Sequence, residues 1–413
     1  MKTADPPLPV VRGEGALLIG EDGKTYIDAV SSWWVNLHGH AHPYIAERVK
    51  EQMDRLEHVI FAGFTHPPAV ELAERLVQIL PGNQSRLFFS DNGSTAVEIA
   101  IKMAIQYFYN RGEKRRKLIA FDKAFHGETF GAMSASGDLS FNNAFKDHLF
   151  EVLRIPSPVP GREEVALRAL EEILKSESAY AFIFEPLVMG AGGMLMYSPE
   201  ILDRLIALCH ENEVLCIADE VMTGFGRTGR HFACDYLSER PDLMCLSKGL
   251  TGGTLPLAIT TCTEPIFEAF LSEDKYKTFF HGHSYTANPV GCAAALASLD
   301  LLESEKCGRQ IQRIVQRHAA FRKHIEAHET IRSVRQQGTI LALEFRAPGV
   351  SSYFNELRDK LYRFFLERGV LLRPLGNIIY LIPPYCITDE QLEQVYTAIE
   401  AALEHFLVQK PMA

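Results

Sequence analysis

Short apolar runs alternate with longer segments of helical period through the middle of the chain. Strand-length runs occur at 86–90, 117–121, 181–184, 214–218, 243–246 and 257–261, and helical patterns include 42–55, 67–80 and a long segment from the Gly-Ser turn at 93–94 to about 111. Strands that alternate with helices in this way predict a mainly parallel, doubly wound sheet that is covered on both faces. We therefore expect an α/β protein.

The two ends of the chain have a different pattern. Strand-like pieces at 16–19 and 25–28 predict a small antiparallel element near the N-terminus. The pattern from 289 to about 325 is helical, with a break expected near Cys307. The remainder of the chain is typical of an α+β unit, with a strand at 331–345, a helix at 352–368, strands near 371 and 378, and a helix from 388.

Two of the apolar runs end in charged residues that a strand interior would not hold. Asp219 closes the run at 214–218, and Lys248 follows the run at 243–246. Because the carboxyl ends of strands in an open α/β sheet face the ligand crevice, these side chains are expected to meet around one bound molecule. A lysine in that place is typical of Schiff-base chemistry. Taken singly, an Asp after a strand is more often a turn residue, and a Lys beside Gly is more often solvated.

Three glycines, at 224, 226 and 229, spell the dinucleotide-binding pattern GxGxxG directly after a strand. Such a site needs the glycines to open an amphipathic helix, and the segment 227–232 has no helical apolar period. We therefore do not expect a nicotinamide cofactor.

Composition narrows the function classes. The chain has 413 residues, 47% hydrophobic and 23% charged, and a formal net charge of −10, which does not favour nucleic-acid binding. It contains no apolar run long enough to span a membrane and no apolar leader, so we expect neither a membrane protein nor export. The eight cysteines lack C-x-x-C spacing, which indicates reduced packing residues in a cytoplasmic protein and no metal site.

The sequence around Asp219 and Lys248 resembles the class III pyridoxal-phosphate aminotransferases. The matching segments are ADEV at 218–221, TGFGRTG at 223–229 and SKG at 247–249. The segments SSWW at 31–34, HG at 38–39, FAGFTH at 61–66, GAGGM at 190–194 and YLIPP at 380–384 are similar to the biotin-pathway branch of that family. The resemblance implies a fold-type I transferase with a large domain at 51–295 and a small α+β domain built from residues 1–50 and 296–413.

The resemblance also implies a cofactor, pyridoxal phosphate, and roles for the two charged residues. Lys248 would carry the cofactor and move a proton, and Asp219 would pair with the pyridine nitrogen. The strand, Gly-Ser turn and helix start around 93–94 suit an anion and would hold the phosphate, although such a stretch is more commonly a plain helix cap. The cofactor-binding residues implied in this way are Gly93, Ser94, Phe125, Asp219, Val221, Lys248 and Ser284. Ser284 would come from a neighbouring subunit, which implies a homodimer with shared active sites.

The substrate is inferred from the resemblance alone. It implies transfer of an amino group to 8-amino-7-oxononanoate, giving 7,8-diaminononanoate. The substrate-binding residues would be Trp33, Trp34, Phe125, Gly282, Arg373 and Tyr380. By spacing alone the tryptophans favour core positions, Tyr380 suits core or pocket, and Arg373 suits either a carboxylate clamp or the surface at a strand end.

Two departures from family patterns bear on the choice of substrate. Most family members have Tyr and Asp where Phe125 and Glu128 stand here. We still expect S-adenosylmethionine, the usual donor of the family, to be the amino donor, and lysine is the alternative donor. Aminotransferases for ornithine or 4-aminobutyrate carry a glutamate in the segment that contains Ala191, and these omega-amino acids are the alternative substrates. A silent binding protein of the same fold is a third interpretation, which the presence of both Asp219 and Lys248 disfavours.

Overall fold

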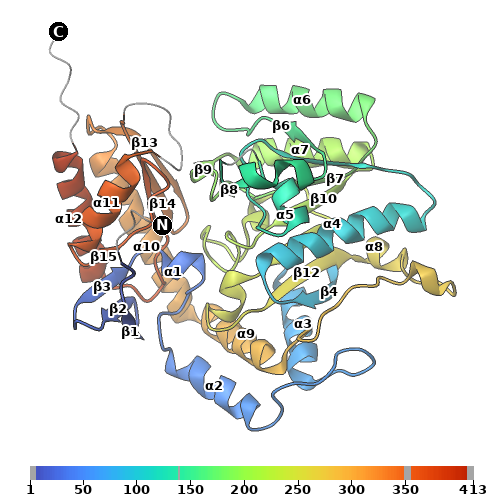
Figure 1. Cartoon of the computed structure of the whole chain (residues 1–413), viewed down its shortest axis with the longest axis horizontal. Helices are drawn as coiled ribbons and strands as arrows, with labels where there is room; N and C mark the ends of the chain where they lie inside the picture. The colour runs from blue at the N-terminus through green and yellow to red at the C-terminus, as the bar shows by residue number, and fades with distance from the viewer. Residues whose placement is uncertain (1–5, 138–139, 348–354, 407–413) are drawn as a thin grey trace. The chain divides into compact units, whose positions relative to one another are not determined.

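A seven-stranded sheet organises the larger of the two units into which this computed structural model divides (Figure 1). The structure describes residues 6–137, 140–347 and 355–406. Unit 1 joins Met1–Glu47 to Glu303–Ala413, and unit 2 is the continuous stretch Arg48–Leu302. The sheet of unit 2 has the order β4-β12-β11-β10-β7-β5-β6 and consists of β4 (Gln84–Ser90), β5 (Lys117–Phe121), β6 (Val152–Ile155), β7 (Ala179–Phe184), β10 (Leu215–Asp219), β11 (Leu243–Leu246) and β12 (Ala258–Thr263).

Six of these strands run in one direction. β10 pairs in parallel with β7 and β11, and β5 pairs in parallel with β7 and β6. Only β12 is reversed, since it is antiparallel to both β11 and β4. The predicted mainly parallel sheet is thus confirmed, and the carboxyl ends of β4, β5, β7, β10 and β11 lie along one edge.

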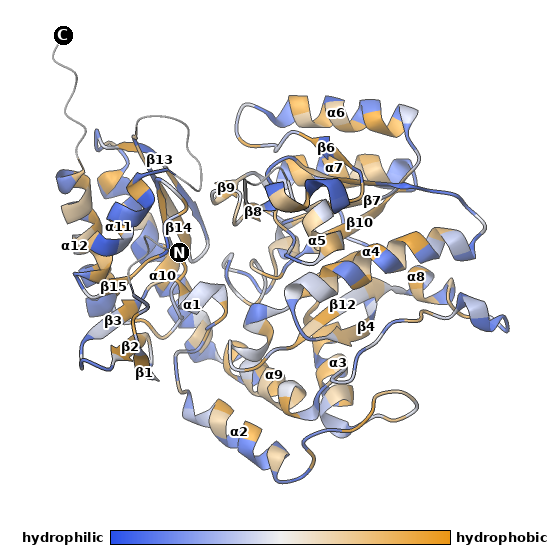
Figure 2. Cartoon of the chain, in the orientation of Figure 1, coloured by the Kyte–Doolittle hydropathy of each residue, from blue (hydrophilic) through white to orange (hydrophobic). Residues whose placement is uncertain are grey.

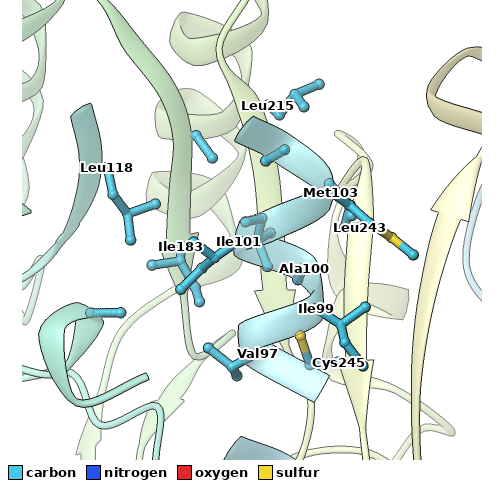
Figure 3. Close-up of a cluster of buried hydrophobic side chains, with 14 of the residues drawn as sticks. Val97, Ile99, Ala100, Ile101, Met103, Leu118, Ile183, Leu215, Leu243 and Cys245 are labelled. Carbon is cyan, nitrogen blue, oxygen red and sulfur yellow. The ribbon is translucent and has the colours of Figure 1, made fainter. Parts of the chain in front are cut away.

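Helix α4 (Gly93–Asn110) packs against β7, β10, β11 and β12. Its side chains Val97 and Ile101 belong to a buried cluster that Figure 3 shows together with Leu118, Ile183, Leu215, Leu243 and Cys245 of the strands. The alternate strand residues, such as Phe182 and Cys216, are also fully buried. Because successive strand residues point to opposite faces, the sheet is buried on both, which explains its continuous apolar runs.

The remaining elements of unit 2 surround this sheet. Figure 2 shows apolar and polar residues alternating along α6, whose buried positions are Ala166, Leu167 and Leu170. Helix α9, by contrast, is buried along most of its length. These elements are α3 (Pro67–Ile79), α5 (Phe130–Ala135), α6 (Glu163–Ser176), α7 (Pro199–Glu211), α8 (Glu264–Glu268), α9 (Pro289–Leu302), β8 (Val188–Met189), β9 (Leu195–Met196) and the 3₁₀ turns η1 (Ser140–His148), η2 (Ala233–Tyr236), η3 (Lys248–Thr251) and η4 (Lys275–Lys277).

Unit 1 combines both ends of the chain because strands from each end pair with one another. β3 near the N-terminus and β15 near the C-terminus are parallel neighbours in a sheet of order β1-β2-β3-β15, and a second sheet has the order β13-β14-β16. The elements are β1 (Val10–Glu14), β2 (Leu17–Gly20), β3 (Thr25–Asp28), α1 (Ser31–Trp34), α10 (Glu305–Ile325), β13 (Ile331–Gln337), β14 (Ile340–Phe345), α11 (Leu357–Leu366), β15 (Val370–Leu371), β16 (Ile378–Leu381) and α12 (Asp389–His405). Helix α2 (Pro43–Met53) spans the boundary between the units.

Two predicted elements were wrong. The helical stretch breaks before Cys307: α10 begins after Ser304, whose Oγ accepts the Cys307 N–H at 3.2 Å and caps the helix. The strand expected at 331–345 is a hairpin of β13 and β14, turned at Gly338 with φ +57°. Part of the helix expected at 352–368 lies outside the described residues, and α11 accounts for the rest. None of the helices in the described ranges has the length and apolarity needed to cross a membrane.

Candidate active site

Asp219 and Lys248 come from the ends of neighbouring parallel strands. Asp219 is the last residue of β10 and lies opposite Cys245 of β11, and Lys248 follows the end of β11 as the first residue of η3. The backbone of Lys248 has φ +45°, a left-handed conformation that costs a non-glycine residue about 1–3 kcal/mol and that is found mostly at functional sites. The turn at the end of β11 therefore positions this lysine at a cost in backbone conformational energy.

The amine of Lys248 has an altered acidity. Burial lowers its pKa from the ordinary lysine value, the carboxylates of Asp219 and Glu185 oppose that shift, and the charge of Arg227 adds to it. A lowered pKa increases the neutral fraction of the amine, which is the form that attacks carbonyl carbon and accepts a proton.

The carboxylate of Asp219 is buried and held by two donors. His126, from the loop after β5, places its Nδ1 2.8 Å from Asp219 Oδ2, and the Val221 N–H donates to Oδ1 at 3.1 Å. An ionised carboxylate only accepts hydrogen bonds, so Nδ1 carries the proton. The other ring nitrogen, Nε2, is buried and has no hydrogen-bond partner among the described residues. Sequence reasoning missed His126, although it directly follows Phe125 after a strand.

A second carboxyl group, Glu185, follows β7 at the same edge of the sheet. Its oxygens accept the N–H groups of Phe125 at 2.9 Å and Gly190 at 2.8 Å. Burial, and then the charge of Asp219, raise the pKa of Glu185 to about 8, so this group is mostly protonated at neutral pH. Sequence reasoning missed Glu185 too, although a charged residue directly after an apolar strand is the signal that identified Asp219.

Glu220, next to Asp219, has a different environment. Its carboxyl group accepts hydrogen bonds from Thr223 Oγ1 at 2.6 Å and from the N–H groups of Ala233 and Cys234 at 3.1 and 2.7 Å. Burial raises its pKa to about 7. These bonds tie the glycine-rich turns after β10 to η2. The three glycines of the dinucleotide motif therefore lie in turns, and not at the start of the helix that such a motif requires.

The turn between β4 and α4 contains the residues expected to bind phosphate. The cap interpretation holds for Asn92, whose side chain accepts the Thr95 N–H at 3.0 Å. Ser94 Oγ instead accepts the Glu128 N–H at 3.0 Å, which joins this turn to the loop after β5. The first N–H groups of an 18-residue helix have no acceptor within the helix, and they favour an anion.

Two glycines allow three of these loops to approach one another. A Cβ at Gly93 would lie 2.7 Å from Val221 Cγ1, and a Cβ at Gly127 would lie 2.2 Å from Ser94 Oγ. Gly127 also has φ +138°, which a side chain would disfavour. The loops that follow β4, β5 and β10 therefore meet at positions where only glycine fits.

This set of groups fits pyridoxal phosphate. It combines an amine of lowered pKa, a buried carboxylate held by a histidine, a helix N-terminus for phosphate, and the half-buried side chains of Phe125 and Val221. Gly282 and Ser284, by contrast, are exposed in the loop between η4 and α9.

The other predicted substrate residues form a cluster in unit 1. The guanidinium carbon of Arg373 lies 4.2 Å from the centre of the Trp33 ring, and the rings of Trp34 and Tyr380 meet edge to face with centroids 6.0 Å apart. Trp33 is 56% exposed, whereas Trp34 and Tyr380 are 5% and 2% exposed. The tryptophan pair is thus divided between surface and core.

Both tryptophans lie in a left-handed turn of the backbone. The residues Ser31–Trp34 have φ values of 50°, 47°, 82° and 74°, a conformation that costs about 1–2 kcal/mol per residue. The buried carboxylate of Asp28 accepts the Ser32 N–H at 2.9 Å and the Ser32 Oγ–H at 2.6 Å, and it contacts His40 Nε2 at 2.8 Å. These bonds hold the turn in place.

Comparison with known proteins identifies the family of this chain. The family model described as "Aminotransferase class-III" matches residues 1–403. The adenosylmethionine-8-amino-7-oxononanoate aminotransferase of Synechococcus elongatus is 48% identical over 98% of this chain and 96% of its own. The crystal structure of the enzyme of that name from Methanocaldococcus jannaschii has a TM-score of 0.91 at 37% identity, covering 97% of this chain and 94% of its own.

A solved structure of a transaminase in complex with PMP is similar as well. This omega transaminase from Pseudomonas jessenii has a TM-score of 0.90 at 28% identity, covering 97% of this chain and 92% of its own. With the family match over most of the chain, this likeness agrees with the fit of the residues at the strand ends. The chain belongs to the class III aminotransferases and is a transaminase that depends on pyridoxal phosphate.

Proposed function

We propose that this transaminase transfers an amino group from S-adenosylmethionine to 8-amino-7-oxononanoate, giving 7,8-diaminononanoate in biotin biosynthesis. The names of its relatives from Synechococcus elongatus and Geobacter sulfurreducens, which are 48% and 41% identical, contain both substrates. The observation in this chain that carries the proposal is the pairing of Arg373 with Trp33, because a cation beside an aromatic surface suits an acceptor with a carboxylate and a long apolar chain.

The residues of unit 2 divide the chemistry among them. Pyridoxal phosphate, when bound, supplies an electron-accepting ring. Lys248 would hold it covalently, and the Nζ of Lys248 would accept and return a proton. Asp219, oriented by His126, would keep the proton on the pyridine nitrogen.

The remaining cofactor contacts bind and orient. The N-terminus of α4, with Gly93 and Ser94, would hold the phosphate, and Phe125 and Val221 would cover the ring. Glu185 supports the loop of Phe125 through the Phe125 N–H.

Substrate recognition is assigned to unit 1 and to two further positions. Arg373 binds the acceptor carboxylate, Trp33 contacts its apolar chain, and Trp34 and Tyr380 form the supporting wall. Gly282 and Phe125 also contact substrate, and neither residue has a side-chain hydroxyl group. S-adenosylmethionine remains the proposed donor, because aromatic surroundings contribute more to binding its sulfonium cation than a single hydroxyl group would.

The direct test presents single substrates to the purified holoenzyme. We expect S-adenosylmethionine to convert the visible band of the cofactor to that of its aminated form faster than lysine, ornithine or 4-aminobutyrate at equal concentration. 8-Amino-7-oxononanoate should then restore the original band, and 2-oxoglutarate or succinic semialdehyde should not. If lysine is faster, the donor is wrong; if ornithine or 4-aminobutyrate is faster, the chain is an omega-amino-acid transaminase.

We further propose a homodimer in which Ser284 contributes to the phosphate site of the partner. Large apolar side chains are exposed near this loop in the sequence and in the segment before α3, namely Ile60, Phe64, Phe280 and Tyr285. We expect the partner subunit to cover the apolar surface of both segments.

Complementation between two inactive variants tests the shared site. Ser284→Glu should lose activity through repulsion of the phosphate, and Lys248→Ala should lose it through the missing amine. If Ser284 acts in the partner's site, mixed dimers of the two variants contain one intact site and recover activity after co-expression. Absence of recovery in dimers that are shown to be mixed contradicts sharing, and a monomeric mass by light scattering contradicts the dimer.

A cytoplasmic location is also part of the proposal. All eight cysteines are free, and seven of them are buried, which suits a reducing compartment.

A further inference from the structure

A second group of potential ligands lies at the amino ends of β10 and β11, the opposite sheet edge from Asp219 and Lys248. His210 in the last turn of α7, Cys216 near the start of β10, and Asp242 just before β11 each offer one ligand atom, and these atoms lie within 4.8 Å of one another. Cys216 is fully buried, and the other two residues are partly buried. Nothing in the transaminase reaction uses these side chains.

We propose that His210, Cys216 and Asp242 bind a zinc ion. The distance from His210 Nε2 to Asp242 Oδ2 is 3.2 Å, close to the ~3.3 Å expected between two ligands at ~2.0 Å from a tetrahedral zinc. The Cys216 N–H donates to the same Asp242 oxygen at 2.7 Å and orients it. A thiolate, an imidazole and a carboxylate together favour zinc, because magnesium and calcium take oxygen ligands.

The surroundings supply an outer partner for the histidine. His210 Nδ1, the ring nitrogen that would not bind the metal, is 3.5 Å from Glu239 Oε2. Metal-bound histidines usually donate their other N–H to a carboxylate in this way. A water molecule would take the fourth position of a tetrahedral zinc that three protein ligands hold.

An ordinary ion pair is the competing explanation for this cluster. A protonated His210 between Asp242 and Glu239 satisfies all three side chains without a metal, and the thiol of Cys216 then only fills space. The two explanations differ in whether the holoenzyme takes up zinc and in whether Cys216 is needed for it.

Metal uptake by the full-length, untagged holoenzyme tests the proposal. After treatment with a chelator and dialysis against zinc, we expect one zinc per chain by elemental analysis. Cobalt(II) in its place should give d–d absorption at wavelengths beyond the cofactor band, with the intensity of a tetrahedral site that contains a thiolate. Wild-type protein that retains no zinc, or that gives only the weak spectrum of hydrated cobalt, overturns the proposal.

Matched variants locate the ion. Cys216→Ala and His210→Gln should each lose the zinc and the cobalt spectrum, whereas Cys292→Ala, at another buried cysteine, and His148→Gln, at an exposed histidine, should keep both. Because Cys216 lies in a central strand and its variant risks misfolding, the partly exposed His210 provides the second test, with the fold checked by circular dichroism. Retention of the ion by a folded His210→Gln protein overturns the site. Glu239→Gln should weaken zinc binding by about 10–100-fold, and unchanged affinity would contradict its role as outer partner.

Discussion

The two regions that hold the predicted functional residues are built in opposite ways. In unit 2 the charged groups follow the ends of regular strands, and each buried carboxyl group has defined donors, as Asp219 has His126 and Val221. In unit 1, Trp33 stands on a left-handed turn and Arg373 precedes a proline outside any strand. The groups proposed for the reaction are thus placed by secondary structure, whereas the groups proposed for recognition depend on irregular backbone held by single buried residues such as Asp28.

The strongest test of the strand-end region is Lys248→Ala. We expect turnover to be abolished while the protein remains folded and still binds pyridoxal phosphate without a covalent bond, because no other group can supply the amine. Lys248→Arg is the control that keeps the charge and should be equally inactive. Appreciable transaminase activity in either variant would remove Lys248 from its role, and the readout is amino transfer together with the visible spectrum of the cofactor.

Asp219→Asn should cost about 10²–10³-fold in turnover, because a neutral amide does not hold the proton on the pyridine nitrogen. The matched control is Glu220→Gln, which replaces the neighbouring carboxyl group that is bound to Thr223 and Cys234. We expect the control to lose much less activity. A loss below about tenfold in Asp219→Asn would transfer the role to another group.

His126→Leu tests whether the support of Asp219 contributes to rate. Removing a hydrogen bond to a charged group costs about 1.5–3 kcal/mol, so kcat should fall by roughly 10–100-fold. His126→Asn, which keeps an N–H donor, should recover part of that loss in kcat. Its pH profile of kcat should be closer to that of the wild type than the profile of His126→Leu is. Equal defects in both variants would mean that His126 only fills space.

Arg373→Ala tests the recognition region. We expect the affinity for 8-amino-7-oxononanoate to fall by about 2 kcal/mol, the low end for a truncated charge pair, because Arg373 is only half buried. Arg368→Ala is the matched control, since Arg368 also lies over an aromatic ring of unit 1, 3.5 Å from the centre of Phe364. An unchanged KM for 8-amino-7-oxononanoate in Arg373→Ala would mean that Arg373 does not bind the acceptor.

The smallest effect is expected at Phe125, which lies in unit 2 but is proposed to contact substrate. Phe125→Tyr introduces a hydroxyl group and should improve the use of S-adenosylmethionine by about 0.5–1.5 kcal/mol, the contribution of one hydrogen bond. Phe130→Tyr, at an exposed phenylalanine nearby in the sequence, should change nothing. Poorer use of S-adenosylmethionine by Phe125→Tyr would show that this pocket is adapted to a different donor.

Local patterns were sufficient for much of the fold. The continuous apolar runs predicted strands buried on both sides, and the charges at or just beyond the ends of two of them identified Asp219 and Lys248 as candidates. Both inferences use only neighbours in the chain, since the alternation of side chains and the end of an apolar run are local properties.

The features that the sequence alone did not determine depend on contacts between distant segments. His126 and Glu185 follow strand ends too, but only the strand order β11-β10-β7-β5 brings them to Asp219. The adjacent tryptophans are a second case, because the left-handed φ values at Ser31–Trp34 are stabilised by Asp28 and oppose local preference. Hydrophobic period therefore determined where strands and helices form. Tertiary structure decided which polar groups meet, because residue type provides donors and acceptors but strand order brings them together.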